Sequence, residues 1–333
     1  WINTSVPILQ LFFNEGDLKP AFRLNRATLV LLLQMLPLQK VHGWPQEIEV
    51  LVTLYWLACG ASYRATADIF GMPLSTVCRV VHRVVNSLMG IIPKIIFLPK
   101  PQDLEVVGAG FARLAGIEAF RAAVGANDGC HVRIVPPAEP QKRCYMNRKL
   151  FPSIILQGVC DARGKFMDVY IGNVSSVHEA LVLRRSPLYK NALYPPEGFF
   201  LLGDGGILPK LKVNFIFGTS QVEARYNRHH AKARNIVERA FGSLKTTWWR
   251  SIFFKLLEVR PTFAPKVIAA CCTLHNICLE AGDQVDVEQE VNPEADGHPA
   301  AEDREMSGSC LQARLAVQIS CPAELPEILS EHD

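Results

Sequence analysis

The sequence has no apolar run that could cross a membrane as a helix, which needs roughly 18–20 consecutive apolar residues. The longest candidate, residues 28–38, is interrupted by Gln34 and Pro37. The sequence also lacks an internal repeat, which excludes a repeat architecture. Charged residues make up only 20% of the 333 positions and hydrophobic residues 49%. We therefore expect a mostly globular protein without a membrane partner.

Cysteine is present, but not in the dense, regular spacing of a disulfide scaffold. The ten cysteines are scattered, and Cys59, Cys78, Cys160 and Cys271 lie in apolar surroundings. This usage predicts a reduced compartment, the nucleus or the cytoplasm. Because the chain begins with Trp1 instead of methionine, we also expect a fragment or a processed form.

Acidic residues are scarce in most of the chain and concentrated at its C-terminus. Residues 280–333 contain 14 acidic and 2 basic residues, whereas residues 1–279 contain 33 basic and 18 acidic residues, a net charge of +15. A basic body of this kind predicts a polyanionic partner such as nucleic acid. The acidic tail, residues 281–333, has few aromatic residues and no sustained periodicity, so we expect it to be disordered.

Hydrophobic periodicity divides the rest of the chain into two regions. Residues 1–95 have apolar residues at helical spacing and predict a helical region. Prolines within residues 96–105 predict a linker,. Residues 106–280 combine β-branched segments with helical patterns, which predicts a mixed α/β domain. We expect strands near residues 124–135, 154–161, 166–171 and 199–202, and helices near residues 177–185, 230–249 and 263–279.

Residues 62–88 are predicted to form a helix-turn-helix unit. A short helix over residues 63–70 would end at Gly71, and Ser75 or Thr76 would cap the second helix,. A valine stripe would bury one face of the second helix. Its other face would carry the candidates for DNA contacts, Arg79, His82 and Arg83. Such a unit can lay a recognition helix in the major groove, but an ordinary helical hairpin with a solvated basic face would have the same pattern.

Three acidic residues lie where a carboxylate is costly to bury. Asp128 interrupts an apolar strand, Asp204 follows an apolar run and precedes two glycines, and Glu238 lies in an apolar helix turn. A buried carboxylate needs a partner or a metal to offset its desolvation. Three such acids can converge on two Mg²⁺ ions, which prefer oxygen ligands and catalyse phosphoryl displacement in pairs. The alternative is salt bridging, by Glu238 with Arg234 or Arg239 and by Asp204 with Lys210.

Basic residues share the predicted helix with Glu238 and are candidates for contacts to the DNA backbone. They are Lys232, Arg234, Arg239 and Lys245.

Cys272, His275 and Cys278 fall three positions apart on one predicted helix. This spacing could suggest zinc, but no convincing fourth ligand lies nearby and the surroundings are apolar. A core helix is the favoured interpretation.

Several blocks of the sequence follow one another in the order of a known family. They read GANDGCHVRIVPP (125–137), NRKLFPSIILQGVCDARGKFMDVYIG (147–172), SSVHEALVLRRSPLYK (175–190), LLGDGG (201–206), HHAKARNIVERAFGSLKTTWWRSIF (229–253) and LHNICL (274–279). Together with ASYRATADIFGMPLSTVCRVVHRV (61–84), they resemble the PIF/Harbinger-type DDE transposases and the host nuclease-like proteins derived from them.

The resemblance implies an RNase H-like catalytic core over residues 106–280, preceded by a helical N-terminal domain with the helix-turn-helix. It carries the family's three metal-binding catalytic acids onto Asp128, Asp204 and Glu238. It further implies dependence on Mg²⁺ or Mn²⁺, hydrolysis of DNA phosphodiester bonds, a nuclear setting and a separate DNA-binding partner protein.

The sequence departs from the family pattern at several places. Glu179 stands where family members usually have aspartate, and Ile207-Leu208-Pro209 where a Tyr-Pro pair is expected. Asn127 replaces an apolar residue, and residues 210–226 match poorly. These departures motivate an alternative function, a recruited DNA-binding or scaffolding protein with weak or no catalysis.

Overall fold

The structure is a computed structural model that describes residues 6–37, 43–174, 179–190, 194–203, 212–213, 221–245 and 256–283. Within them, no helix combines the length and the apolar character that spanning a membrane requires.

The N-terminal region is helical, as predicted. Its elements are α1 (Pro7–Phe13), α2 (Lys19–Phe22), α3 (Arg26–Met35), α4 (Gln46–Cys59), α5 (Tyr63–Phe70) and α6 (Leu74–Ile95). The Ser62 hydroxyl accepts a hydrogen bond from the Ala65 N–H and so caps α5, which ends at Gly71 with φ +59°. Glycine adopts this left-handed conformation without steric cost. The predicted cap at Ser75 or Thr76 is wrong, because α6 begins directly after Pro73 and has no side-chain cap.

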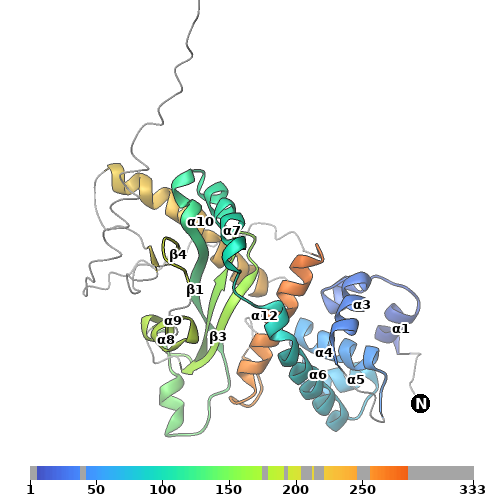
Figure 1. The fold of residues 1–333 in the computed structure, drawn as a ribbon. Helices are drawn as coiled ribbons and strands as arrows, with labels where there is room; N and C mark the ends of the chain where they lie inside the picture. The colour runs from blue at the N-terminus through green and yellow to red at the C-terminus, as the bar shows by residue number, and fades with distance from the viewer. Residues whose placement is uncertain are drawn as a thin grey trace, which may run out of the picture.

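A mixed five-stranded sheet forms the second region (Figure 1). The strands are β1 (Ala123–Arg133), β2 (Ser153–Cys160), β3 (Phe166–Val174), β4 (Phe200–Leu202) and β5 (Lys212–Val213). Their order is β3-β2-β1-β4-β5. The first three strands are antiparallel, whereas β4 runs parallel to β1 and β5 runs parallel to β4. The α/β class is therefore confirmed, with β1 at the centre of the sheet.

Helices cover both faces of this sheet. They include α7 (Leu104–Ala115), α8 (Glu179–Arg185), α9 (Pro187–Lys190), α10 (Gln221–Ser243) and α12 (Ala264–Glu280), with short 3₁₀ turns η1 (Pro101–Asp103), η2 (Glu118–Ala122) and η3 (Gln141–Tyr145). One apolar cluster joins the sheet to α8 and α9 through Leu183 and Leu188. The larger cluster joins the opposite face to α10 and α12 through Phe241 and Val267. The helix predicted over 230–249 begins nine residues earlier than expected, at Gln221.

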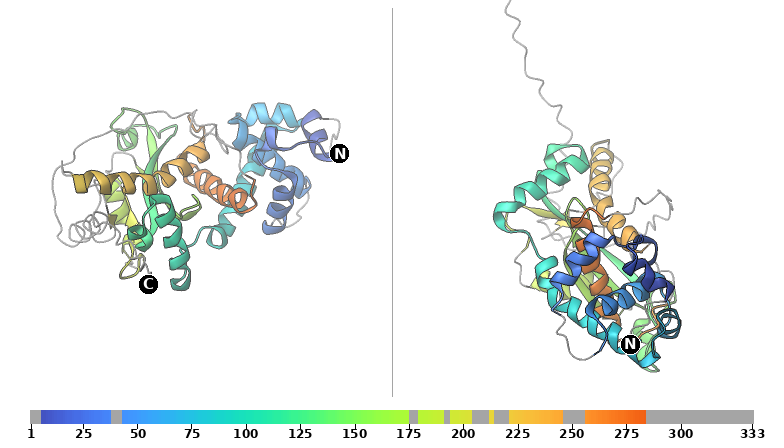
Figure 2. Two further views of the ribbon diagram at one scale, coloured as in Figure 1. Left: turned by 90° about the horizontal axis from the view of Figure 1, so that it is seen from above. Right: turned by 90° about the vertical axis from the view of Figure 1, so that its right-hand side faces the viewer.

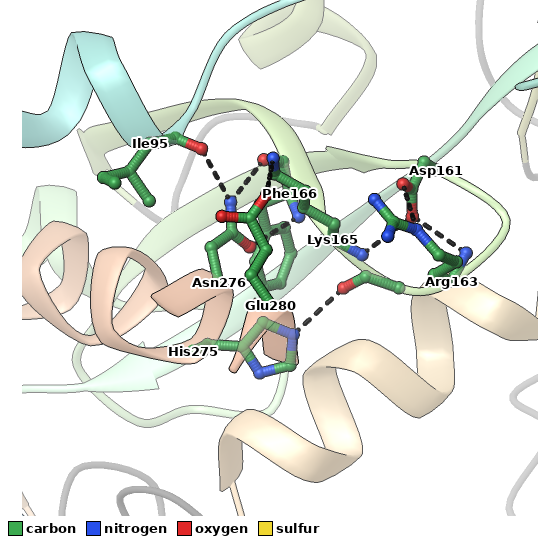
Figure 3. Close-up of polar contacts among 9 residues, drawn as sticks. Ile95, Asp161, Arg163, Lys165, Phe166, His275, Asn276 and Glu280 are labelled. Carbon is green, nitrogen blue, oxygen red and sulfur yellow. Dashed lines mark hydrogen bonds and ion pairs between the residues drawn. The ribbon is translucent and has the colours of Figure 1, made fainter. Parts of the chain in front are cut away.

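Helix α12, the last one in the described part of the chain, lies between the helical region and the sheet (Figures 1 and 2). Asn276 on this helix donates from Nδ2 to the carbonyl oxygens of Ile95, at 3.2 Å, and Phe166, at 2.7 Å. Its Oδ1 accepts from the Phe166 N–H at 2.8 Å (Figure 3). One side chain thus ties the end of α6 to the start of β3. The larger apolar cluster is one connected group of buried side chains, and its members range from Leu9 on α1 to Cys278 on α12.

The residues weighed as zinc ligands belong to this core. Cys272, His275 and Cys278 are all buried, and His275 Nε2 lies 3.0 Å from the Gly164 carbonyl oxygen (Figure 3). Burial lowers the pKa of His275 to about 4, because desolvation disfavours the charged ring. The predicted core helix is confirmed.

Candidate functional site

Asp128 occupies the middle of the central strand β1. Its Oδ1 accepts a hydrogen bond from the Gly129 N–H at 2.8 Å. Successive side chains of a strand point to opposite faces. Accordingly, the neighbouring Asn127 is buried and accepts a bond from Gln157 Nε2 at 3.1 Å, whereas Asp128 contacts α10. The polar residue that replaces the family's apolar one next to Asp128 therefore has a partner in β2.

Arg234 brings Asp128 and Glu238 together. Its Nη2 lies 3.1 Å from Asp128 Oδ2, and its Nη1 lies 2.6 Å from Glu238 Oε1. Arg234 and Glu238 are one turn apart on α10 (i, i+4), which places them side by side on the helix surface. One guanidinium thus joins two of the three predicted catalytic acids.

The three side chains differ in their access to solvent. Arg234 is 11% exposed and Asp128 17%, whereas Glu238 is 50% exposed. A guanidinium buried to this extent is stabilised only if its charge is paired, and the two carboxylates supply that pairing. The salt-bridge alternative for Glu238 and Arg234 is thus present, and it extends to Asp128. Arg234 directs two nitrogens to carboxylates, and its predicted contact with DNA stays a prediction.

The donor chemistry of this group fits a hard divalent cation. Asp128 and Glu238 supply carboxylate oxygens, the ligands that Mg²⁺ and Mn²⁺ prefer. Both lie within reach of one guanidinium. Among the residues that the structure describes, no three His, Cys, Asp or Glu side chains cluster as a metal site.

Asp204, the third predicted acid, lies outside the described residues. Strand β4, which ends two positions before Asp204, pairs with β1, the strand that carries Asp128. Leu202 of β4 is the register partner of Ala126 of β1, and Asp204 and Asp128 each follow two positions later. Glu179 is the first residue of α8, and its side chain lies outside the described part, as do residues 207–211.

The exposed face of α10 is basic. Arg225, Arg228, Lys232 and Arg239 are exposed along it, and Lys245 beyond its end is half-buried. Lys245 lies near His131 of β1. The pKa of His131 is lowered mainly by burial and further by the charge of this lysine. Arg225 and Arg228 were not among the predicted contacts, because the predicted helix began at residue 230 and the observed one begins at Gln221. The steps of three residues from Arg225 to Arg228 and of four from Arg228 to Lys232 were the available signal,.

The sheet and the helices that pack on it lie in a part of the chain that is similar to a known protein family. Residues 127–276 match the family described as DDE superfamily endonuclease. This stretch is similar to a DDE superfamily endonuclease domain, and it is called the DDE domain below. Its match begins one residue before Asp128 and includes Asp204 and Glu238.

The relatives of this DDE domain confirm the resemblance to Harbinger-derived proteins. The chain is 28% identical over 283 residues to "Putative nuclease HARBI1" of Mus musculus, a match that covers 83% of this chain and 79% of that protein. It is 28% identical over 275 residues to "Protein ALP1-like" of Arabidopsis thaliana, covering 77% of this chain and 66% of that protein. No solved structure matches the chain significantly.

The helix-turn-helix candidate lies outside the DDE domain match, on α5 and α6. Arg79 is exposed, and its Nε lies 3.3 Å from the Ser75 carbonyl oxygen of the same helix. Arg83 Nη1 lies 2.6 Å from Oε1 of the buried Glu49 on α4. His82 stacks on Phe263, with ring centroids 3.8 Å apart. Within the described part of the chain, the hydrogen bonds of Arg79 stay on its own helix. Arg83 and His82, the other two predicted DNA contacts on α6, also pack this helix against α4 and Phe263.

Proposed function

We propose that the chain is a divalent-metal-dependent DNA endonuclease with an RNase H-like core. The observation that carries the proposal is the meeting of Asp128, from the central strand, with Glu238, from α10, on one guanidinium. The strand order β3-β2-β1-β4-β5, with antiparallel strands on one side of β1 and parallel strands on the other, supports the RNase H-like assignment. Similarity to the DDE superfamily endonuclease domain supports the reaction class.

Asp128, Glu238 and Asp204 would hold Mg²⁺ or Mn²⁺. A pair of such ions, when bound, stabilises the charge on the attacking and leaving oxygens of a phosphoryl displacement. Gly129 orients the Asp128 carboxylate through its N–H. The rigid core beneath α10, which includes Val237 and Phe241, fixes the position from which Glu238 extends.

DNA is the proposed substrate and partner. The exposed basic residues of α10, Arg225, Arg228, Lys232 and Arg239, would bind phosphates next to Glu238. Arg79 on α6 would add a second contact from the helix-turn-helix. The net charge of +15 over residues 1–279 favours association with a polyanion. We further propose a nuclear location and a separate DNA-binding partner protein, both of which rest on the family resemblance.

A nicking assay on supercoiled plasmid tests this function. The full chain should nick DNA with Mg²⁺ or Mn²⁺ and not with EDTA, and Asp128→Asn or Asp204→Ala should abolish the activity. Asp103→Asn is the matched control, because Asp103 is exposed and lies in η1, before the DDE domain match. Unchanged nicking by Asp204→Ala would contradict the assignment of the three acids.

A DNA-binding protein without cleavage is the second candidate function. It is favoured by Arg234, whose charge already pairs with both described carboxylates, and by Glu179, where the family usually has aspartate. This function predicts salt-sensitive binding of duplex DNA that weakens with Arg79→Ala, and no strand cleavage with either metal. Robust metal-dependent nicking by the wild-type chain would eliminate it.

A further inference from the structure

We infer that Arg234 competes with the divalent cation for Asp128 and Glu238, so that its guanidinium must leave at least one carboxylate before the ion binds. This inference rests on the proposed function, since it concerns the same site. It makes Arg234 a positioning residue that sets metal affinity, which differs from its predicted role as a DNA contact.

The first support is the choice of carboxylate oxygens. On Asp128, Oδ1 accepts the Gly129 N–H at 2.8 Å, and Arg234 takes the other oxygen, Oδ2, at 3.1 Å. Arg234 also binds Glu238 Oε1 at 2.6 Å. A cation that bound Asp128 Oδ2 or Glu238 Oε1 would have to displace the guanidinium nitrogen that now lies against that oxygen.

The second support is burial. Arg234 is 11% exposed and lies between a β1 carboxylate and an α10 carboxylate. A positive charge there is poorly screened by solvent, so its repulsion of a divalent cation is strong. The two cations cannot both make close contacts to the same carboxylate oxygens.

The third support is the unequal freedom of the two acids. Asp128 is fixed in the central strand, whereas Glu238 is 50% exposed and sits on the same helix as Arg234. Rotation of the Arg234 side chain along α10 would release Asp128 Oδ2 without moving the sheet. Arginine has a long side chain with many rotamers, so such a movement requires no change in the backbone.

Calorimetric titration of the full chain with Mn²⁺ tests the inference. Arg234→Gln should bind Mn²⁺ at least tenfold more tightly than wild type, because the competing charge is gone. Arg234→Lys keeps the charge and should stay within a few-fold of wild type. Arg113→Gln is the matched control, since Arg113 is an exposed arginine on α7 and should change the affinity less than threefold.

The outcomes separate this inference from the proposed function. Equal or weaker Mn²⁺ binding by Arg234→Gln, with binding by wild type intact, overturns the inference alone. Absence of binding by both proteins overturns the metal site and the proposed function with it. Circular dichroism and thermal melting of each variant establish that it folds.

A second measurement applies if Arg234→Gln does not fold. In the ¹⁵N NMR spectrum of the wild-type chain, the Nε–H resonance of Arg234, assigned by its loss in Arg234→Lys, should shift on saturation with diamagnetic Mg²⁺. A resonance that stays unchanged at saturation overturns the inference.

Discussion

At the scale of single residues, Arg234 joins Asp128 and Glu238 into one charged group. Asp128 and Glu238 stand out because each interrupts an apolar pattern, and burial makes such a charge costly. The pair of Glu238 with Arg234 was visible as an i, i+4 spacing. The contact of Arg234 with Asp128 spans 106 positions, and no local pattern encodes a tertiary contact of that range.

His275 should make the protein sensitive to acid. Its Nε2 bonds to the Gly164 carbonyl, and burial lowers its pKa to about 4. Between pH 6.5 and 4 the unfolded chain takes up a proton at this site that the folded chain does not. The stability that the neutral His275 ring contributes is therefore fully present above pH 6.5. It is lost as the pH falls toward 4, by about 1 kcal/mol of unfolding free energy per pH unit.

Urea denaturation of wild type and His275→Gln at pH 7, 5.5 and 4.5 checks this prediction. Glutamine retains a donor for Gly164 but does not titrate. The difference in unfolding free energy between the two proteins should change in favour of the variant as the pH falls. An equal acid dependence of both proteins would contradict the account.

Arg83 should matter for stability more than its exposed position suggests. It is 46% exposed, but its partner Glu49 is only 5% exposed. Burial raises the pKa of Glu49, and Arg83 partly offsets this. Arg83→Ala should cost about 1–3 kcal/mol at pH 7, because it leaves a buried carboxylate without that charge.

The loss in Arg83→Ala should shrink below about pH 4.5, where Glu49 is protonated in both folded and unfolded chains. Thermal or urea denaturation at pH 7 and 4 measures it. Arg79→Ala, four residues earlier and exposed, is the control and should change stability by less than about 0.5 kcal/mol. An equal effect of the two substitutions would disprove the role of Glu49.

At the scale of elements, periodicity predicted where most helices and strands form but not what each one packs against. The turn at Gly71, the strand β1 and the core helix α12 were all visible as local patterns. The early start of α10 was missed because residues 221–229 are mostly polar and carry no apolar stripe. The bridging position of α12 depends on contacts with Ile95 and Phe166, which are distant in the chain.

Asn276 should therefore be a key residue for the stability of α12. Asn276→Ala removes three hydrogen bonds and leaves backbone groups of Phe166 and Ile95 without this partner in the core. We expect a loss of about 3 kcal/mol, since each buried polar group left unsatisfied costs roughly 1–3 kcal/mol. Urea denaturation measures this loss.

The control for Asn276→Ala is Asn86→Ala. Asn86 is exposed and accepts a hydrogen bond from Lys266 at 3.0 Å. Its loss should cost less than about 0.5 kcal/mol, because water replaces the bond. If both substitutions had the same small effect, α12 would not depend on Asn276.

The basic stripe of α10 should bind the DNA backbone without regard to sequence. Replacing Arg228 or Lys232 by alanine should weaken duplex binding uniformly and lower the salt slope by about 1. Fluorescence anisotropy at several salt concentrations measures both quantities. Alanine at Lys142, an exposed lysine in η3, is the control. An unchanged slope in the α10 variants would exclude this face as the contact.

At the scale of the whole molecule, composition predicted a basic body, and periodicity predicted a helical part followed by an α/β part. Both parts are present in that order. The prolines within residues 96–105 predicted a linker between two domains, and that boundary stays a prediction. In the structure, α12 contributes to the packing of both parts (Figure 2), so binding events on α6 and in the DDE domain share a structural element.

Calorimetric titration with Mn²⁺ can show whether Asp128, Asp204 and Glu238 form one metal site. The wild-type chain should bind Mn²⁺, whereas Asp204→Asn and Glu238→Gln should each lose most of that binding while keeping the wild-type melting behaviour. Undiminished Mn²⁺ binding by Asp204→Asn, or the absence of binding by the wild-type chain, would contradict this prediction.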